Sequence, residues 1–497
     1  MLARVTGNLA ELVRASAGAH PDKAALVFHG EVTTWGDLDA SVDAVARGLR
    51  GLGLQPGDRV AVHLGNTPEF AAAYFGVLRA GLTALPVNTG YTAAELSHVL
   101  VDSGARAVIT SAAGAGTVRE ADGSVEHLVV TGESSWSDLT ADSSPYPSEG
   151  GGEDLAVLLY TSGTSGRPKG AMLTHRALLA NLEQTGTIEP PVVAPDDVVL
   201  LVLPLFHVYG LNGALGMVAR TGATGVLVER FDPVPTLDEI RKHHVSTVVG
   251  APPMWVAWSL LPDVGDAFAS VRVALSGAAP LPPSVLHRVL EVTGHHVFEG
   301  YGMTETAPVL TSTLMSEAAK PSSIGRPVPG VELRLVDEAG NEVEEGDPGE
   351  ILVRGANLFS GYWPDGADGP DADGWFGTGD IAVTDEDGDL HLVDRRRELI
   401  LVSGFNVYPR EVEEVIAAHR DVVEVAVLGI EHPYTGESVK ALVVRRPGAS
   451  LTTEDVIAHA ARSLARFKCP TVVEFVDELP HTATGKVSKG RLRERDG

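Results

Sequence analysis

At YTSGTSGRPKG, residues 160–170, the chain places hydroxyl side chains, glycines and a lysine between two apolar segments. Gly163 and Gly166 let backbone N–H groups turn toward an anion, because glycine tolerates positive φ. Lys169 adds a positive charge, and hydroxyl groups come from Thr161, Ser162, Thr164 and Ser165. So many specialised residues in one short stretch disfavour an ordinary surface loop. The stretch therefore predicts a phosphate-binding loop.

The loop does not have the spacing of a standard P-loop. That motif needs its lysine directly after the second glycine, followed by a hydroxyl residue. Here Arg167 and Pro168 separate Gly166 from Lys169, which disfavours a P-loop ATPase. The apolar run LAVLLY precedes the loop, and AMLTHRALLANLEQT after it predicts a helix. The expected arrangement is strand, loop and helix, the place where α/β proteins bind phosphate.

Short apolar runs alternate with amphipathic segments on both sides of this loop. DRVAVHLG (58–65) predicts a strand, PEFAAAYFGVLRAG (68–81) a helix, and a similar alternation covers 196–277. Such alternation is typical of parallel sheets covered by helices on both faces. We therefore predict an α/β fold with two doubly wound layers. The small and polar residues of 112–153 predict a loop region.

The pattern changes in the last third of the chain. After residue 330, period-2 alternation with glycine-containing turns predicts antiparallel hairpins, and from about 395 a small α+β unit follows. We place a domain boundary near Asp394, giving domains 1–394 and 395–497. The acidic turns at 365–374 and 385–390 do not have the spacing of a calcium loop.

Composition excludes several classes of function. The chain has 497 residues and a formal net charge of -28, so it has no basic excess for nucleic acid or anionic membranes. Cys469 is the single cysteine and is expected to be a free buried thiol. The first residues, which are charged and have no apolar core, are not expected to be a signal peptide, and the sequence has no apolar run of the ~20 residues that a membrane span needs. We expect a cytoplasmic protein without integral membrane association, and the oligomeric state stays open, a homodimer included.

Several further motifs follow the loop in a recognisable order. They are LPLFHVYG (203–210), SGAAPL (276–281), EGYGMTE (299–305), GWFGTGD (374–380), DRRRELILVSGFNVYPREVEE (394–414) and TATGKVSK (482–489). Together with the loop, these motifs resemble the adenylate-forming superfamily, and the resemblance spans essentially the whole chain. It implies a large N-terminal domain of two doubly wound α/β subdomains plus a small β-barrel-like subdomain. A small mobile α+β C-terminal domain would follow.

The resemblance also implies a chemistry, in which ATP activates a carboxylate as an acyl-adenylate and CoA then accepts the acyl group. ATP, Mg²⁺ and CoA would be the cofactors and co-substrates. Two anions meet in this reaction, so it needs charge neutralisation and alignment more than proton transfer. Glu305 would be the Mg²⁺ ligand. The implied catalytic residues are Lys486, Thr304, Glu305 and His207.

The implied binding residues fall into two groups. ATP and AMP would contact Thr161, Ser162, Gly163, Thr164, Ser165, Gly166, Lys169, Gly277, Ala278, Ala279, Glu299, Gly300, Tyr301, Gly302, Thr304, Asp380 and Arg395. The acyl pocket and CoA tunnel would contain His207, Val208, Tyr209, Met303, Pro308, Val309 and Gly404.

Individual roles follow from the same resemblance. The loop would hold the β- and γ-phosphates, Tyr301 would stack on adenine, and Asp380 would bind the ribose hydroxyls. Lys486 would bridge the attacking carboxylate and the α-phosphate, then leave when the small domain turns about Asp394 or Arg395. The chain departs from the family at Arg397, where a lysine is common, which puts any specific role of that position in doubt.

The amino-acid residues of the motifs favour one branch of the superfamily. EGYGMTETAP and ILVSGFNVYPREVEEVI look most like fatty-acid–CoA ligases, and the candidate pocket lacks an obvious cation for a second carboxylate. We therefore expect a medium- or long-chain fatty acid as substrate. An aryl-acid–CoA ligase or an acyl-carrier-protein ligase is the alternative. A nucleotide-binding regulator without turnover is disfavoured by the intact Glu305 and Lys486.

Overall fold

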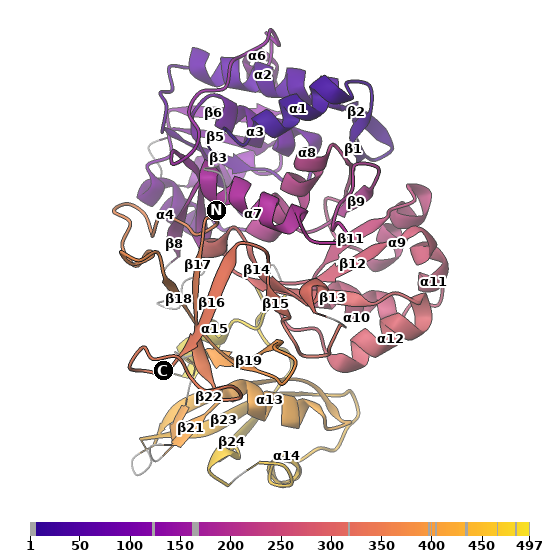
Figure 1. Cartoon of the computed structure of the whole chain (residues 1–497), viewed down its shortest axis with the longest axis vertical. Helices are drawn as coiled ribbons and strands as arrows, with labels where there is room; N and C mark the ends of the chain where they lie inside the picture. The colour runs from indigo at the N-terminus through magenta and orange to yellow at the C-terminus, as the bar shows by residue number, and fades with distance from the viewer. Residues whose placement is uncertain are drawn as a thin grey trace. The chain divides into compact units, whose positions relative to one another are not determined.

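The computed structural model (Figure 1) describes residues 6–121, 125–161, 168–316, 319–395, 398, 400–402, 405–432, 436–464, 466–482 and 485–496. The chain divides into two compact units. The first contains Met1–Glu332 and Arg354–Phe376, and the second contains Leu333–Val353 and Gly377–Gly497. The domain boundary that the sequence predicts near residue 394 stays a prediction.

The first sheet of the first unit is mostly parallel, in the order β6–β5–β3–β4–β7–β8. Its strands are β3 (Arg59–His63), β4 (Thr83–Pro86), β5 (Ala107–Ser111), β6 (His127–Thr131), β7 (Leu155–Thr161) and β8 (Lys169–Thr174). The accompanying helices are α1 (Glu11–Ala19), α2 (Trp35–Gly51), α3 (Pro68–Arg79), α4 (Ala93–Ser103), α5 (Ala115–Glu120) and α6 (Ser134–Leu139). Threonine caps begin α2, α3 and α4, because each threonine oxygen accepts an otherwise unsatisfied N–H.

Two expectations for this sheet are wrong. The residues that follow the loop form β8, antiparallel to β7, and the helix α7 (His175–Gly186) begins only after Thr174, whose hydroxyl caps it. The arrangement is therefore strand, loop, strand and helix. The region 112–153 contains α5, β6 and α6. These elements are too short for their periodicity to stand out among small and polar residues.

The second sheet has the order β15–β14–β13–β12–β11–β9–β10–β1–β2. Its strands are β1 (Ala24–Phe28), β2 (Glu31–Thr34), β9 (Val198–Leu201), β10 (Thr224–Leu227), β11 (Thr247–Gly250), β12 (Val273–Ser276), β13 (Val297–Gly302), β14 (Val309–Ser312) and β15 (Arg326–Pro327). The strands from β1 to β13 along this order run parallel to one another, and β2, β14 and β15 pair antiparallel at the ends.

Helices and one π-helix connect the strands of the second sheet. They are the π-helix Tyr209–Gly216, α8 (Met217–Thr221), α9 (Pro233–Lys242), α10 (Pro252–Ser259), α11 (Val264–Ala267) and α12 (Pro283–Thr293). Helix α11 packs against both α9 and α12, and these helices lie together beside β11, β12 and β13 (Figure 1). The chain order β9, β10, β11 places a topological switch point between β9 and β11, where α/β proteins bind ligands at the carboxyl ends of the strands.

The second unit contains most of a third sheet and a small α+β part. The third sheet runs β16 (Val331–Val336), β17 (Gly349–Gly355), β18 (Phe376–Thr384) and β19 (Leu390–Arg395). The last sheet contains β20 (Ile400–Val402), β21 (Phe405–Val407), β22 (Val422–His432), β23 (Gly436–Arg445) and β24 (Val472–Val476). The helices of this unit are α13 (Pro409–Ala417), α14 (Thr453–Ala460) and α15 (Lys489–Asp496).

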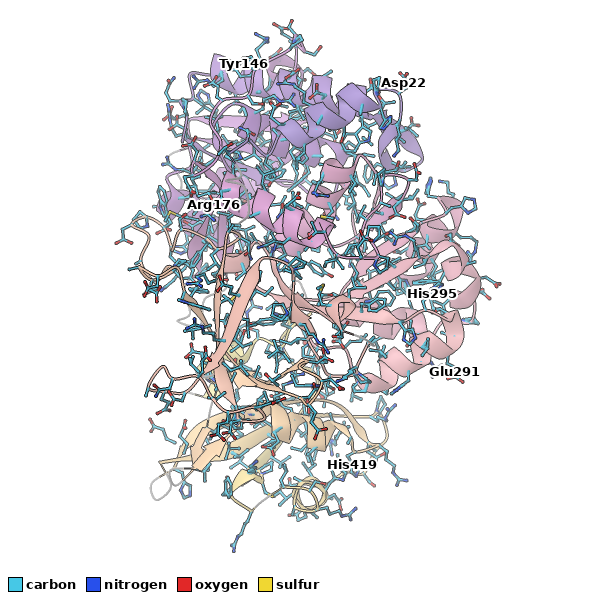
Figure 2. All side chains as sticks on the ribbon, in the orientation of Figure 1. Asp22, Tyr146, Arg176, Glu291, His295 and His419 are labelled. Carbon is cyan, nitrogen blue, oxygen red and sulfur yellow. The ribbon has the colours of Figure 1, made fainter. Side chains whose placement is uncertain are left out.

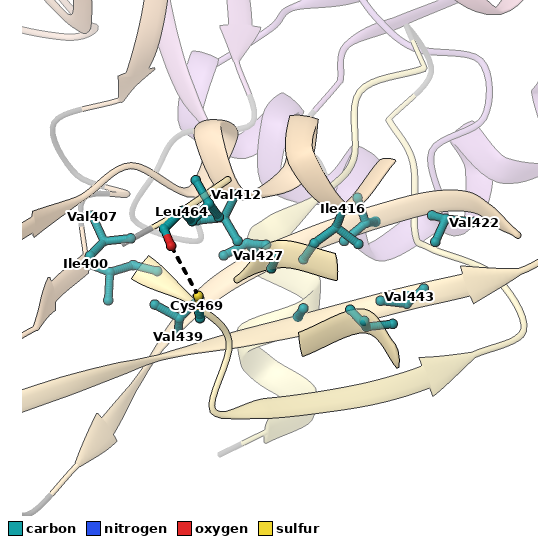
Figure 3. Packing of buried hydrophobic residues seen from close by; sticks show 14 of the residues in the cluster. Ile400, Val407, Val412, Ile416, Val422, Val427, Val439, Val443, Leu464 and Cys469 are labelled. Atoms are coloured by element: carbon teal, nitrogen blue, oxygen red, sulfur yellow. Dashed lines mark hydrogen bonds between the residues drawn. The ribbon is translucent and has the colours of Figure 1, made fainter. Parts of the chain in front are cut away.

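The α+β part has its own apolar core, shown in Figure 3. Val412 and Ile416 of α13 pack over Val427 and Val439 of the sheet. Cys469 lies buried in this core, and burial raises the pKa of its thiol. The expectation of a buried thiol that is in no disulfide is confirmed. In the described ranges, no helix is both long and apolar enough to cross a bilayer.

Candidate active site

The predicted site residues of the first unit follow the carboxyl ends of neighbouring parallel strands. His207 and Tyr209 come after β9, Gly277 to Ala279 after β12, and Thr304 and Glu305 after β13. The carboxyl ends of parallel strands meet at one edge of a sheet. The topology therefore brings motifs that are up to about 100 residues apart to the same edge.

Glu305 lies in a short 3₁₀ turn, Thr304–Thr306, and is only 5% exposed. The hydroxyl of Tyr362 donates a hydrogen bond of 2.6 Å to Oε1 of Glu305. The backbone N–H of Phe359 donates to the carbonyl of Glu305 at 2.9 Å. Among the residues that the structure describes, no other hydrogen bond reaches this carboxylate. Its Oε2 is thus available to an incoming cation.

Buried carboxamides hold the turn that carries Glu305. Asn357 donates to the carbonyl of Thr306 at 2.8 Å, and Asn212 donates to the carbonyl of Ala307 at 2.7 Å. Asn181 donates to the carbonyl of Val309 at 2.8 Å and accepts from its N–H at 3.1 Å. These carboxamides are at most 2% exposed. A turn fixed at three successive sites along its backbone gives Glu305 a defined direction.

Ala307 has a left-handed backbone, with φ 63°, although it is not a glycine. Such a conformation costs free energy and persists where the surroundings fix it. Ala307 is fully buried, and the carboxamide of Asn212 binds its carbonyl. The strain therefore lies beside the predicted catalytic pair Thr304 and Glu305, where strained backbone is commonly part of a functional site.

Tyr209 begins the π-helix Tyr209–Gly216 and packs tightly between two glycines. A β-carbon built on Gly277 would lie 2.7 Å from Cε1 of Tyr209, and one on Gly213 would lie 2.9 Å from Cδ2. Burial raises the pKa of the Tyr209 hydroxyl. The predicted acyl-pocket residue Tyr209 and the predicted nucleotide-contacting backbone of Gly277 are therefore in direct contact. π-helical turns often occur at functional sites.

The remaining predicted acyl-pocket residues lie close to Tyr209 in the chain or in space. His207 is half-buried, and its Nδ1 accepts the N–H of Tyr209 at 3.3 Å. Val208 is 1% exposed, and a β-carbon on Gly213 would also lie 3.8 Å from Cγ of Pro308. Met303 and Val309 are half-buried on either side of the Glu305 turn.

The turn after β12 is tied to β13 by a buried carboxylate. Glu299 is 6% exposed, and its Oε1 accepts the N–H of Leu281 at 2.9 Å. This bond fixes the turn that includes Gly277, Ala278 and Ala279, in which Ala278 has φ 71°. Gly300, Tyr301 and Gly302 follow in β13, and Tyr301 is half-buried.

Only the ends of the predicted phosphate loop belong to the described residues. Thr161 ends β7 and lies opposite Lys169 in β8. The Nζ of Lys169 is 2.9 Å from Oδ2 of Asp368 and 5.0 Å from the ring centroid of Tyr362. The predicted contacts Ser162, Gly163, Thr164, Ser165 and Gly166 lie outside the described residues, as does Gly404 of the predicted tunnel.

The second unit carries the other predicted groups. Asp380 lies in β18, is 7% exposed and faces Arg395 of β19 in the strand register. Lys486 ends a tight turn that Thr482 closes, because Thr482 N–H donates to the Lys486 carbonyl at 2.7 Å and its hydroxyl accepts the Lys486 N–H at 3.1 Å. Lys486 is exposed.

The donor set around Glu305 fits Mg²⁺. Mg²⁺ is commonly bound by one or two carboxylates together with substrate phosphates, and dedicated protein cages are unusual. Over the described ranges, no cluster of three His, Cys, Asp or Glu side chains forms such a cage. Glu305 offers a carboxylate oxygen beside Thr304, which is 8% exposed. When bound, Mg²⁺ would neutralise phosphate charge.

Two family models match the chain. The model described as "AMP-binding enzyme" matches residues 13–363, and "AMP-binding enzyme C-terminal domain" matches 411–486. The chain belongs to the AMP-binding enzyme family. The resemblance given by the sequence motifs is thereby confirmed.

Curated relatives of this family member are similar over nearly their whole length. The long-chain-fatty-acid–CoA ligase of Yersinia pestis is 36% identical over 533 residues, covering 98% of this chain and 94% of the relative. The feruloyl-CoA synthase of an Amycolatopsis species is 37% identical over 485 residues, covering 96% of each. The crystal structure of ATP-bound MatB from Rhodopseudomonas palustris is 34% identical, with a TM-score of 0.92 over 98% of each chain. The predicted fold class is confirmed.

The sequence motifs missed the residues that support Glu305. Tyr362 lies in a loop outside all the quoted motifs, and the carboxamides come from separate elements. One signal was present, since Asn181 and Asn212 interrupt apolar runs at positions that a buried helix face would fill. A buried polar side chain needs partners, so such an interruption indicates a specific polar contact.

Gly277→Ala is expected to raise the KM for both ATP and the acid. The added methyl group would lie 2.7 Å from Cε1 of Tyr209 and would therefore push the ring out of its present position. Overpacking of this kind costs about 1–3 kcal/mol, which corresponds to about 5- to 150-fold in binding. Steady-state kinetics measures the effect, with Gly51→Ala as the control because a β-carbon there meets nothing within 4 Å. Unchanged KM values would contradict a shared wall between the two pockets.

Proposed function

We propose that this AMP-binding enzyme is an AMP-forming acid–CoA ligase. The observation that carries the proposal is the buried Glu305 carboxylate, which Tyr362 and the carboxamide-held turn orient at the carboxyl edge of the second sheet. Such an arrangement suits the binding of a cation, which would neutralise the charge of ATP, more than proton transfer. The relatives named as CoA ligases support the same reaction.

The reaction has two steps that balance in atoms and charge. A carboxylate oxygen of the acid attacks the α-phosphorus of ATP, the bond to the β-phosphate oxygen breaks, and pyrophosphate leaves. The CoA thiolate then attacks the acyl carbon, the acyl–oxygen bond breaks, and AMP leaves. Glu305 would hold Mg²⁺ and Thr304 would contact the α-phosphate. Lys486 would stabilise the charge that develops in the first step.

Residues predicted for the other ATP contacts would bind and orient the nucleotide. The loop 161–169 would hold the β- and γ-phosphates, and Asp380 would accept hydrogen bonds from the ribose hydroxyls. The small domain would turn about Asp394 or Arg395, removing Lys486 and presenting Gly404 to CoA. A cytoplasmic location and a homodimer stay predictions from the sequence.

The proposed substrate is a medium- or long-chain fatty acid. The name of the Yersinia pestis relative supports it, as do the apolar pocket candidates Val208, Met303 and Val309. An aryl acid is the second candidate, because the Amycolatopsis relative is named a feruloyl-CoA synthase and is about as similar. The ATP contacts would be the same in both cases, so the pocket alone would decide between the acids.

Pyrophosphate release measured across a series of acids tests the proposal. We expect release to depend on added acid, to rise with chain length for saturated fatty acids, and to yield AMP and acyl-CoA once CoA is added. Greatest activity with cinnamate or benzoate analogues would favour the aryl acid. Pyrophosphate release that does not depend on added acid would contradict the proposed ligase activity. Transfer of the acyl group to an acyl carrier protein but not to CoA would show that the acceptor is the carrier protein.

A further inference from the structure

Tyr362 touches two groups that are expected to meet the phosphates of ATP. Its hydroxyl donates to Oε1 of Glu305 at 2.6 Å. Its ring lies 5.0 Å from the Nζ of Lys169, a distance at which an ammonium is attracted to an aromatic face. A carboxylate from the turn after β13 of the second sheet and a cation from β8 of the first sheet therefore share one aromatic side chain.

The backbone around Tyr362 is fixed to the strand that leaves the phosphate loop. Residue 362 pairs with Ala171 of β8 in an isolated antiparallel bridge. Trp363 N–H donates to the carbonyl of Gly170 at 2.8 Å, and Ser360 N–H donates to the carbonyl of Met172 at 2.9 Å. The segment 360–363 thus runs along β8 and is hydrogen-bonded to it.

Neighbouring contacts also restrict the side chain and its loop. Phe359 is 1% exposed and meets the ring of Tyr362 edge-to-face at 5.1 Å. The indole N–H of Trp363 donates to the carbonyl of Asp102 at 2.9 Å. Gly361 has φ 95°, and a β-carbon there would lie 2.1 Å from the carbonyl oxygen of Gly366. These contacts give the Tyr362 ring a fixed position on a tight turn.

We propose that Tyr362 is a positioning residue that aligns the metal-binding carboxylate of Glu305 with the phosphate-binding end of β8. The hydroxyl occupies Oε1 and thereby turns Oε2 toward the cation. The ring face holds Lys169 near the same place. This inference rests on the proposed function, because it assigns Tyr362 to the binding of ATP with Mg²⁺ at that site.

The geometry separates the two contributions of Tyr362. Tyr362→Phe removes the hydroxyl but keeps the ring, so only the alignment of Glu305 is lost. Tyr362→Leu removes both, so Lys169 also loses its aromatic neighbour. The first variant should weaken binding that depends on the metal, whereas the second should also weaken binding of the phosphates themselves.

Isothermal titration calorimetry with ATP tests this, once with Mg²⁺ and once with EDTA. Tyr362→Phe is expected to raise the Kd for ATP with Mg²⁺ about tenfold, since a hydrogen bond to a charged group is lost, and to leave the Kd in EDTA unchanged. Tyr362→Leu is expected to raise both values. Glu305→Gln combined with Tyr362→Phe should bind no more weakly than Glu305→Gln alone, because the tyrosine acts through the carboxylate.

A matched control comes from a second tyrosine of the first unit. The hydroxyl of Tyr146 hydrogen-bonds Glu149, and this tyrosine is labelled in Figure 2. Tyr146→Phe removes a phenol–carboxylate bond of the same kind and should leave both Kd values unchanged.

The outcomes distinguish this inference from the proposed function. Wild-type binding of ATP together with equal binding by Tyr362→Phe would overturn the role of Tyr362 and leave the proposed function intact. Equal weakening with and without Mg²⁺ would assign Tyr362 a merely structural role and would also overturn it. Failure of the wild-type chain to bind ATP would instead overturn the proposed function. Thermal unfolding of each variant shows whether the fold is kept.

Discussion

Lys486→Ala is expected to lower the rate of acyl-adenylate formation by about 100- to 1,000-fold, the usual effect of removing one group that stabilises developing charge. The reaction brings a carboxylate against a phosphate, and Lys486 would be the cation between them. Lys486 is exposed at the end of a turn closed by Thr482, so its side chain can be shortened without opening the core. The fold should therefore remain intact.

The second step should respond differently. Acyl-CoA formation from supplied acyl-adenylate is expected to be largely retained in Lys486→Ala, because the lysine would have left the site before the thiol enters. Single-turnover assays of the two steps measure this division. Arg462→Ala, which removes an exposed cation from the same unit, is the control and should leave both steps unchanged. An equal loss of rate in both steps would contradict the assignment of Lys486 to the first step alone.

Glu305→Gln is expected to lower adenylation by about 100-fold, because the cation that Glu305 would hold loses the attraction of a full negative charge, which contributes a few kcal/mol even at a high effective dielectric constant. Glutamine keeps the shape and an oxygen that accepts the Tyr362 hydrogen bond. The loss therefore reports on the negative charge and on little else.

The dependence on Mg²⁺ identifies the cause of that loss. Pyrophosphate release measured over a Mg²⁺ titration should show a higher requirement for the metal in Glu305→Gln. Glu291→Gln, on the exposed face of α12 (Figure 2), removes a carboxylate elsewhere in the same unit and should have no effect. A wild-type Mg²⁺ profile in Glu305→Gln would contradict the metal-binding role.

The sequence predicted the residues that lie within motifs. Gly277 follows the last strand of the alternation predicted for 196–277, whereas Thr304 and Glu305 came from a motif and follow β13, for which no strand was predicted. The parallel topology brings the ends of both strands to one edge. The order of the motifs identified the family, which the family models confirm. Short sequence patterns carry this information because strand ends and turns favour particular residue types.

Contacts between distant segments could not be predicted in the same way. Tyr362 meets Glu305 across 57 positions, and Asn181 meets Val309 across 128. No local pattern specifies which buried polar side chain finds which carbonyl. The packing of Tyr209 against Gly277 likewise depends on how the turns after β9 and β12 approach each other.

The error at β8 has a local cause. AMLTHRALLANLEQT contains apolar spacing that suits a helix, yet its first residues pair with β7 as a strand. The start signal was Thr174, whose hydroxyl accepts the N–H of Ala177. Helix α7 therefore begins at His175, four residues after the start of the predicted helix at Ala171. The phosphate loop therefore joins two antiparallel strands, which fixes both of its ends.

The fate of the acid's oxygen tests the central claim most directly. In adenylation, a carboxylate oxygen bonds to the α-phosphorus and stays with AMP when CoA takes the acyl group. A fatty acid labelled with ¹⁸O in its carboxylate, incubated with ATP and CoA, should therefore give AMP that carries the label, as read by mass spectrometry. AMP without the label, or products that contain no AMP, would contradict activation of a carboxylate at this site.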